Sequence, residues 1–240
     1  MQKSRRMRIY KSSWHVAVTM FFVIAPFIFL LYFSRIANIA TGKLFSDLLI
    51  SFIRLIIAYA IAALLGWTLA ISFYTGPRAS VALPVFDVLQ SFPTFALLPL
   101  ATLFWGASNF TIIFFLVITI IWPLIFSVVS SLKLIRKDWE EAVEIYGLSG
   151  SNYLKNFLWP VSITGLITGS IIGLGEGWEA LIATEIIINI PNGLGSFFQA
   201  YSTNAQVTLF GVLGFLILIF SINKIIWLPL LEWSHKKMEE

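Results

Sequence analysis

The strongest constraint on the fold is a series of apolar runs, each about as long as a bilayer is thick. A helix needs about 20 apolar residues to cross the hydrocarbon core of a membrane. Runs of this size, bounded by charges or by Gly, Pro and Asn, are Trp14 to Phe33, Leu48 to Phe73, Leu83 to Trp105, Phe110 to Ser130, Val161 to Ile187 and Val207 to Leu231. The sequence therefore predicts an all-α, polytopic membrane protein with about six transmembrane helices, forming a single domain over residues 1–240.

The composition agrees with a body solvated by lipid. Apolar residues make up 58% of the chain and charged residues 12%, whereas a soluble domain averages about a quarter charged residues. We interpret Trp105, Trp122, Trp159 and Trp227, near predicted span ends, as interface anchors. The absence of cysteine excludes a disulfide framework and thiolate chemistry. The two histidines lack partners at metal-ligand spacing, so no metal site is predicted.

The basic residues predict the orientation of the chain in the membrane. In a six-span arrangement only Arg35 and Lys43 fall on one side, and Arg54 and Lys224 lie inside spans. The other side holds Lys3, Arg5, Arg6, Arg8, Lys11, Arg78, Lys133, Arg136, Lys137, Lys155, Lys236 and Lys237. Because basic residues are retained on the cytoplasmic side, both termini are predicted to be cytoplasmic. The charges are too dispersed to form a stripe for nucleic acid.

The third predicted span is interrupted by Pro84, Pro93 and Pro99. Proline removes a helical hydrogen bond, so this span is expected to be broken or partly re-entrant. Carbonyls freed at the break, together with Gln90 and Ser91, are candidates to line a pathway through the membrane. The alternative is a bend that only accommodates neighbouring helices.

The longest predicted cytoplasmic segment, residues 131–159, has the pattern of a compact loop between the fourth and fifth spans. Trp139 to Tyr146 is predicted to form a two-turn amphipathic helix that Gly147 ends in the left-handed conformation. Ser149 or Ser151 can cap a second short helix that runs toward Pro160, where the next span begins. On amphipathicity alone this remains an ordinary solvated loop.

The spacing within this loop resembles the EAA loop of binding-protein-dependent ABC importer permeases. That pattern is Glu-Ala-Ala, three residues, Gly, nine residues and Ile-x-Leu-Pro. The positions that match it are Glu141, Ala142, Gly147 and Pro160, with Val143, Phe157 and Trp159 as apolar replacements at the other positions. The resemblance implies that this loop is a coupling loop, which docks into an ATPase subunit.

Further motifs between about Leu48 and Tyr201 resemble the nitrate, sulfonate, taurine and bicarbonate branch of these permeases. They are Ser51-Phe52-Ile53-Arg54, Gln90-Ser91-Phe92-Pro93 with Leu98-Pro99, Phe104-Trp105-Gly106, and Trp178 with Ala183-Thr184-Glu185. The resemblance implies a small anion as the solute. Some members of this branch carry neutral heterocyclic vitamin precursors, so a neutral or cationic solute stays open.

The resemblance also implies an assembly in the prokaryotic cytoplasmic membrane. Its expected partners are a second permease copy, two ABC ATPase subunits on the cytoplasmic side, an extracytoplasmic solute-binding protein and lipid. In this interpretation the permease core covers about residues 48–231 and the first span is peripheral. The chain holds no GxxxxGK[ST] motif, so ATP and Mg are expected on the partner ATPases, with no cofactor on this chain.

The fifth predicted span carries small and acidic residues in two patterns. Glycines recur every four residues at Gly165, Gly169, Gly173 and Gly177, a spacing that lets two helices approach closely, either within one subunit or at a dimer seam.

The acidic residues of the same span are Glu176, Glu179 and Glu185, and carboxylates inside a membrane rarely face lipid. Glu176 and Glu179 share one face and are pathway candidates. Glu185 lies on the other face and is expected to form a structural ion pair with Arg54 in the second span.

Two other classes of protein were weighed against the permease. An ion-gradient-driven secondary transporter would use the buried carboxylates as a relay, but its usual inverted repeat is not visible. An intramembrane enzyme would need a paired nucleophile and base or a histidine-rich metal site, and neither is present in the sequence. The chain is therefore expected to be a transport subunit without its own ATPase site.

Overall fold

The computed structural model describes residues 18, 20–21, 23–35 and 40–239, with only the backbone for 235–239, and this part is helical without strands. The helix Val23–Arg35 comes first. The elements that follow are α2 (Thr41–Phe73), α3 (Gly76–Gln90), the 3₁₀ turn η1 (Thr94–Leu97), α4 (Leu98–Trp105), α5 (Asn109–Lys133), α6 (Lys137–Ile145), α7 (Gly150–Tyr153), the π turn η2 (Leu154–Leu158), α8 (Trp159–Ile188), α9 (Leu194–Ala200), α10 (Ala205–Ile222), the π turn η3 (Asn223–Trp227) and α11 (Leu228–Glu239).

Four helical runs are long and apolar enough to cross a membrane. They are Thr41–Phe73, Asn109–Lys133, Gly150–Ile188 and Ala205–Ser234, and the bent pair of Gly76–Gln90 with Thr94–Trp105 would make a fifth. The predicted first span begins at Trp14, outside the described residues, and its described part is the shorter apolar helix Val23–Arg35. The all-α membrane fold is confirmed, while the total of six spans stays a prediction.

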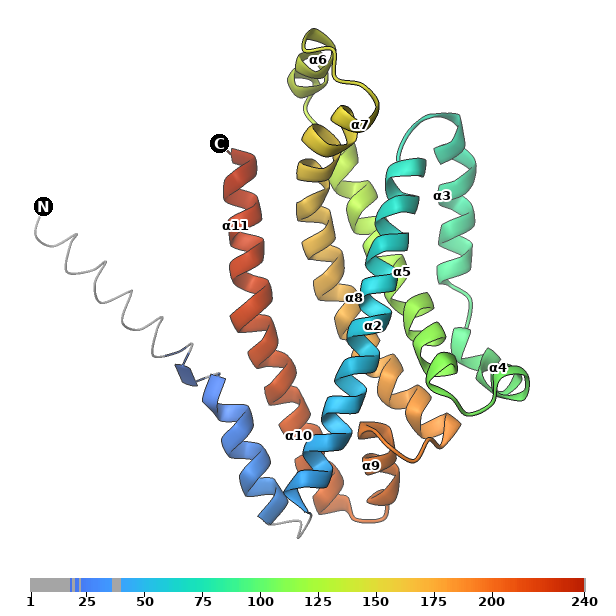
Figure 1. The fold of residues 1–240 in the computed structure, drawn as a ribbon, viewed down its shortest axis with the longest axis vertical. Helices are drawn as coiled ribbons and strands as arrows, with labels where there is room; N and C mark the ends of the chain where they lie inside the picture. Colours follow the sequence, from blue (N-terminus) through green and yellow to red (C-terminus); the bar gives the residue numbers. More distant parts are fainter. Residues whose placement is uncertain (1–17, 19, 22, 36–39, 240) are drawn as a thin grey trace, which may run out of the picture.

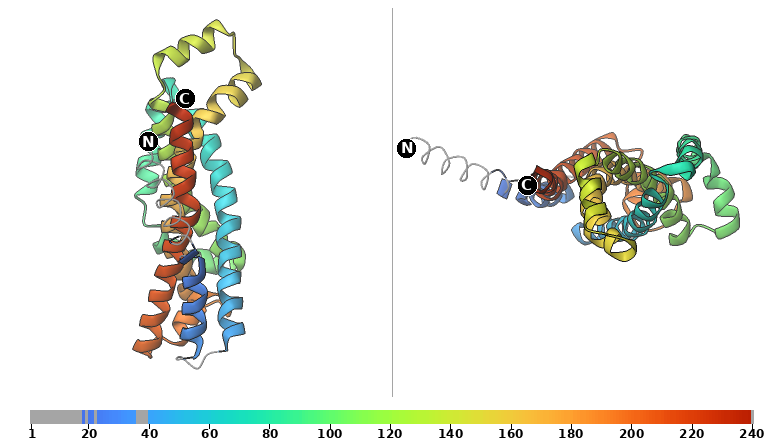
Figure 2. Two further views of the ribbon diagram at one scale, coloured as in Figure 1. Left: turned by 90° about the vertical axis from the view of Figure 1, so that its left-hand side faces the viewer. Right: turned by 90° about the horizontal axis from the view of Figure 1, so that it is seen from above.

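Successive membrane runs are antiparallel and form an elongated bundle (Figure 1). One end of the bundle, which we call the loop end, carries α6, α7 and the last turns of α11; the opposite end, which we call the α9 end, carries α9 (Figures 1 and 2). Of the described basic residues, Arg78, Lys133 and Lys155 lie in elements that reach the loop end, whereas Lys43 lies at the start of α2, at the α9 end. The basic N-terminal residues Lys3 to Lys11 lie outside the described residues.

The centre of the bundle is the contact between α5 and α8. All four glycines of the predicted ridge are buried there. A methyl group at Gly165 would lie 2.7 Å from Val128 Cα, and one at Gly169 would lie 2.8 Å from Leu124 Cα. The two backbones approach so closely that only glycine fits. The ridge therefore packs within one chain and is not free to form a dimer seam.

The second span presents its own small residues to this core. Ala58, Ala62, Gly66 and Ala70 recur every four residues along α2, and all are buried. A methyl group at Gly66 would lie 3.2 Å from Leu124 Cβ, so this row faces α5. Because association of helices in lipid depends on close packing of small residues, α2, α5 and α8 form the tightly packed core. The sequence analysis did not single out this row.

The third predicted span is broken, as its prolines indicated. The two parts, α3 and η1 with α4, are bent by 68° relative to each other. Pro93 immediately precedes η1 and Pro99 lies in the first turn of α4, positions where a missing N–H costs no helical bond. Pro84 lies inside α3, which begins at Gly76, seven residues before the predicted start.

Two helical runs continue through a proline that follows a π turn. The predicted loop was expected to last until Trp159, but helix begins at Gly150 and runs to Ile188. Pro160 and Pro229 each follow a π turn by two residues, after η2 and η3 respectively. Proline has no backbone N–H to donate to the helix. A π turn shifts the hydrogen-bond register by one residue, which allows the helix to continue past the proline. The second half of the loop is thus continuous with the membrane span.

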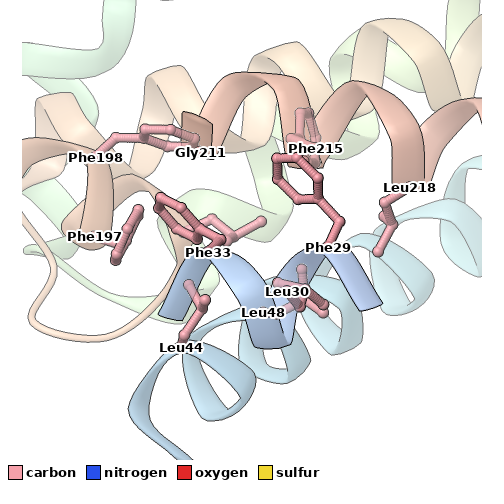
Figure 3. Close-up of a pocket in the computed structure, with 12 residues that line it drawn as sticks. Phe29, Leu30, Phe33, Leu44, Leu48, Phe197, Phe198, Gly211, Phe215 and Leu218 are labelled. Atoms are coloured by element: carbon pink, nitrogen blue, oxygen red, sulfur yellow. The ribbon is translucent and has the colours of Figure 1, made fainter. Parts of the chain in front are cut away.

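The helix Val23–Arg35 packs beside α2, α9 and α10. Its Phe29 and Phe33 enter an apolar pocket with Phe197 and Phe215 (Figure 3). A methyl group at Gly214 would lie 2.6 Å from Phe29 Cε1, so α10 has a notch for this ring. Aromatic packing therefore fixes the described part of the predicted peripheral span to the bundle.

We expect Gly169→Val to destabilise the protein more than Gly175→Val in the same helix. The first substitution places its side chain against the α5 backbone, whereas a Cβ at Gly175 meets nothing within 4 Å. Overpacking of this kind costs about 1–3 kcal/mol. Thermal unfolding in detergent, followed by size-exclusion chromatography, should show a lower midpoint for Gly169→Val. Equal midpoints for the two variants would contradict the close contact.

Candidate functional site

The loop end of the bundle carries a short helical protrusion made of α6 and α7. Asp138 and Glu140 lie in the first turn of α6, where negative charge is favourable next to the free N–H groups. Gly147, with φ +61°, ends the helix in the left-handed conformation. Its N–H donates to Glu144 O, and the N–H of Leu148 donates to Val143 O, as in a glycine-terminated helix. The predicted helix and its stop are present, with bounds shifted by one or two residues.

The outer side of this protrusion is apolar and uncovered. Ile145 and Tyr146 are 82% and 80% exposed. Ala142 and Val143 are half-buried, whereas Glu141, Gly147 and Pro160 are exposed. Exposed apolar side chains at a helix tip, flanked by acidic residues, have the character of a docking surface for another protein.

The protrusion is anchored to the membrane helices by aromatic and apolar packing on its inner side. Trp139, Tyr153 and Leu154 pack against a buried cluster that includes Val128 and Leu132 of α5. The hydroxyl groups of Tyr153 and Tyr74 lie 3.2 Å apart in hydrogen-bond contact. Force applied to the protrusion is therefore transmitted to α5 and, through the continuous helix, to α8.

At the α9 end, Arg54 and Glu185 are brought together as the sequence indicated. The Arg54 Nη1 atom lies 2.5 Å from Glu185 Oε1, and Glu185 is completely buried. Glu185 also accepts hydrogen bonds from Ser51 Oγ at 2.8 and 2.9 Å and from the Gly195 N–H at 2.8 Å. Arg54 donates further to Asn109 Oδ1 and to the Asn192 carbonyl, both at 2.8 Å.

This arrangement, which we call the buried polar network, ties together four parts of the chain. It joins α2, the start of α5, the end of α8 and the loop before α9. A methyl group at Gly193 would lie 2.6 Å from both carboxylate oxygens of Glu185, so the loop closes tightly over the carboxylate. Because the charges are paired and hydrogen-bonded, burial in a membrane is tolerated. The network holds the α9 end together and offers no open site.

Three members of the network were not identified as such from the sequence: Ser51, Asn109 and Asp47. Asp47 is 2% exposed, and its Oδ1 atom accepts from the Gly193 N–H at 3.2 Å. Its Oδ2 atom has no hydrogen-bond partner among the described residues. Asp47 precedes Ser51 by four residues and Arg54 by seven. This one-face spacing is the signal that could have added Asp47.

Glu176 and Glu179 lie elsewhere on α8, on a side of the helix that the described residues leave uncovered. Both are exposed, as are Ile172 and Gly175 on the same stripe. Glu176 lies about 25 Å along α8 from Trp159 at 1.5 Å per residue, which is within the span. Carboxylates at this depth need water or a partner rather than lipid.

Gln90 and Ser91 lie at the break in the third span and are also exposed. Gln90 Nε2 donates to Asp87 Oδ1 at 2.7 Å, and Ser91 Oγ donates to the Asp87 carbonyl at 3.0 Å. Within the described part of the chain, no hydrogen bond joins this cluster to Glu176 or Glu179. The cluster adds a third exposed carboxylate, Asp87, which the sequence analysis had not named.

No group of three or more potential ligands in the described part of the chain could hold a metal ion.

Comparison with known proteins identifies the family. Residues 62–231 match the family described as binding-protein-dependent transport system inner membrane component. The chain is 31% identical over 156 residues, 64% of its length, to the nitrate import permease protein NrtB of Synechocystis sp., and covers 56% of that protein.

Two further relatives are 28% identical to the chain. They are the bicarbonate transport system permease protein CmpB of Synechococcus elongatus, with 67% of this chain and 59% of the relative covered, and the taurine transport system permease protein TauC of Escherichia coli, with 66% and 58% covered. The chain thus spans somewhat less than three fifths of the length of these relatives.

The chain belongs to the family of binding-protein-dependent transport system inner membrane components, because the match covers most of its length. It is a multi-pass helical membrane protein of the ABC permease class. The matched range contains the protrusion, the glycine ridge and all three glutamates of α8. Arg54, Ser51 and Asp47 precede it.

We expect the loss of one partner of the buried ion pair to destabilise the protein more than the replacement of both partners. Arg54→Met alone leaves a buried uncompensated carboxylate, and Glu185→Met alone leaves a buried guanidinium. Each change should cost about 3–5 kcal/mol. The double variant Arg54→Met, Glu185→Met should unfold at a higher temperature than either single variant, measured by thermal melting in detergent. A double variant that loses the sum of both single effects would show that the two charges do not compensate each other.

Proposed function

We propose that the chain is the permease subunit of an ATP-binding-cassette importer that carries a small solute inward. The observation that carries this proposal is the α6 protrusion. Glu141, Ala142 and Gly147 of the protrusion, together with Pro160 at the start of α8, have the EAA-loop spacing. The exposed Ile145 and Tyr146 of the protrusion form an apolar surface. Such a surface fits a groove of an ATPase subunit.

In this proposal the loop end faces the cytoplasm. Arg78, Lys133, Arg136 and Lys155 lie in or beside elements of that end, in agreement with the retention of basic residues inside the cell. Both termini are then cytoplasmic, in the inner membrane of a prokaryote. The α9 end faces outward, toward a solute-binding protein.

ATP supplies the energy from outside the chain. Two ATPase subunits bind ATP and Mg, and their closure moves the two protrusions of a permease homodimer. Because α7, η2 and α8 form one helical run, a tilt of the protrusion becomes a tilt of α8. The exposed Glu176 and Glu179 move with it, which supports alternating access as the mechanism.

The pathway lies between the two permease copies. Glu176 and Glu179 line it from α8, and Gln90 and Ser91 are candidates from the broken third span. All four residues are exposed in the single chain. A carboxylate at membrane depth is costly to expose to lipid, so an exposed one suits a water-filled cavity.

A small anion is the first candidate for the solute. The relatives are named as permeases for nitrate, bicarbonate and taurine, and the motifs of this chain resemble the same branch. A neutral or cationic solute, such as a heterocyclic vitamin precursor, is the second candidate. It is favoured by the exposed carboxylates of Glu176, Glu179 and Asp87, which repel an anion unless they are neutralised.

Affinity purification of the tagged chain from its native membrane tests the proposal. We expect an ABC ATPase to copurify, and the complex to hydrolyse ATP while the chain alone does not. Reconstituted complex with its solute-binding protein should take up solute only with ATP. Uptake driven by an ion gradient through the chain alone would show a secondary transporter instead.

We expect Gly147→Val to uncouple ATP hydrolysis from transport, while Gly147→Asn retains coupling. A Cβ at this position meets nothing within 4 Å, so the effect comes from the positive φ, which valine avoids and asparagine tolerates. The measurement is the ratio of ATP hydrolysed to solute transported in proteoliposomes. The melting temperature of the spans should stay unchanged. Equal coupling in both variants would contradict a docking role for the α6 end.

We expect the double variant Glu176→Gln, Glu179→Gln to change transport far more than stability. Both side chains are exposed in the single chain, so neutralising them removes few internal contacts. Solute uptake kinetics should shift by at least about tenfold, which corresponds to 1.4 kcal/mol, with a melting point close to that of the unmodified protein. The matched control is Glu232→Gln in α11, an exposed residue beside the loop end. A collapse in melting temperature with normal residual transport would make the two carboxylates structural.

A further inference from the structure

Lys224 is a charged side chain inside the last membrane run, and no contact described above accounts for it. It lies about 28 Å along the run from Ala205 and about 15 Å before Ser234, at 1.5 Å per residue. The residue is half-buried. Among the described residues, no carboxylate lies within 4.0 Å of its ammonium group. Ionisable residues at such depth are costly and commonly mark the route of a solute or ion.

A pocket locates Lys224 relative to α8. The pocket lies between α2, α8, α10 and η3 and is lined by Gly175 and Trp178 from α8 and by Asn223 from η3. Residues that line the same small pocket lie at similar depth. Glu176 and Lys224, which directly follow Gly175 and Asn223 in the sequence, are therefore also at similar depth.

The direction of the side chains follows from helix geometry. Glu176 directly follows Gly175 and Lys224 directly follows Asn223, so each is rotated by roughly a quarter turn about its helix from a pocket-lining residue. Glu179 lies on the same exposed stripe of α8 as Glu176. The run of α8 and the run of α10 to α11 are antiparallel (Figure 1). When two neighbouring helices are antiparallel, moving one residue forward from the contact between them rotates the side chain toward the same side of the pair on both helices. Lys224 thus shares one open side with Glu176 and Glu179.

We propose that Lys224 contacts the solute in the translocation pathway and is the positive group that attracts a small anion. This inference rests on the proposed importer function and assigns its anion-binding residue. Glutamates alone would repel an anion, whereas an ammonium group at the same level offsets part of that repulsion and donates hydrogen bonds to an anion directly. Because neither glutamate pairs with Lys224, the ammonium is free to receive the solute.

Cysteine accessibility tests whether Lys224 faces water. This sequence contains no cysteine, so Lys224→Cys gives it a single thiol, whose labelling is followed on this subunit after the complete complex with its ATPase has been treated. We expect charged, membrane-impermeant methanethiosulfonate reagents to modify it. The depth-matched control is Ile61→Cys on α2, about 30 Å along its helix from Thr41 and 41% exposed on an apolar face; it should resist modification. Protection of Lys224→Cys to the level of the control would place Lys224 in lipid and overturn the proposal.

A second experiment tests the effect of the charge itself. Gly175→Cys offers a thiol beside the same open side, where a side chain meets nothing within 4 Å. The rate ratio of an anionic to a cationic reagent is measured with Lys224, Lys224→Gln and Lys224→Arg. We expect Lys224→Gln to lower the ratio about fivefold, because removing a nearby positive charge slows the anionic reagent and speeds the cationic one. Lys224→Arg should keep it. An unchanged ratio in Lys224→Gln would overturn the anion role.

The two proposals fail in different ways. Failure to copurify an ATPase would remove the importer function, whereas the labelling results depend only on where Lys224 points. Reagent access at Lys224→Cys without any ATPase would leave Lys224 in the pathway of another kind of transporter. An ATPase complex in which Lys224→Cys stays protected would preserve the importer and refute the role of Lys224.

Discussion

The close approach of α5 and α8 is the contact on which the rest of the structure depends. Along one side of α8, Gly165, Gly169 and Gly173 bring its backbone against that of α5, and Gly177 makes room for the side chain of Ile120. Another part of α8, near its end, meets α2 through the buried polar network. A further side of the helix presents Glu176 and Glu179 outward. The same helix continues into the protrusion at the loop end. One helix thus connects the three features to which we assign stability, coupling and transport.

The two ends of the bundle differ in how their side chains find contacts: the buried polar network satisfies its own groups, whereas the protrusion exposes apolar side chains. At the α9 end, Arg54 and Glu185 are paired without solvent access, and the glycine-rich loop closes over them. That end is rigid by construction. At the loop end, Ile145 and Tyr146 project from the surface without intramolecular cover. In the proposed function, that end gains its missing contacts from the ATPase subunit.

Much of this could be predicted because the bilayer restricts the choices of the chain. Apolar length gave the long helices, the prolines indicated the broken third span, and the EAA spacing located the protrusion with its Gly147 stop. The Arg54 and Glu185 pairing was foreseeable since buried membrane charges need partners. The remaining features depend on rotation about helix axes and on register. From spacing alone, the glycine ridge could not be assigned to a contact with α5 or with a second subunit. Asp47 and Asn109 join the network only through tertiary contacts. The π turns before Pro160 and Pro229 shift the helical phase by a residue.

The glycine ridge also limits how the molecule can move. Three of its glycines, Gly165, Gly169 and Gly173, lie against the α5 backbone, so α8 cannot slide along its neighbour by part of a turn without driving backbone into backbone. Sliding would therefore be resisted at these three positions, and the two helices are held in a single relative position. Any motion that the protrusion delivers to α8 must consequently carry α5 along as a joined pair, and the hinge has to lie outside both helices.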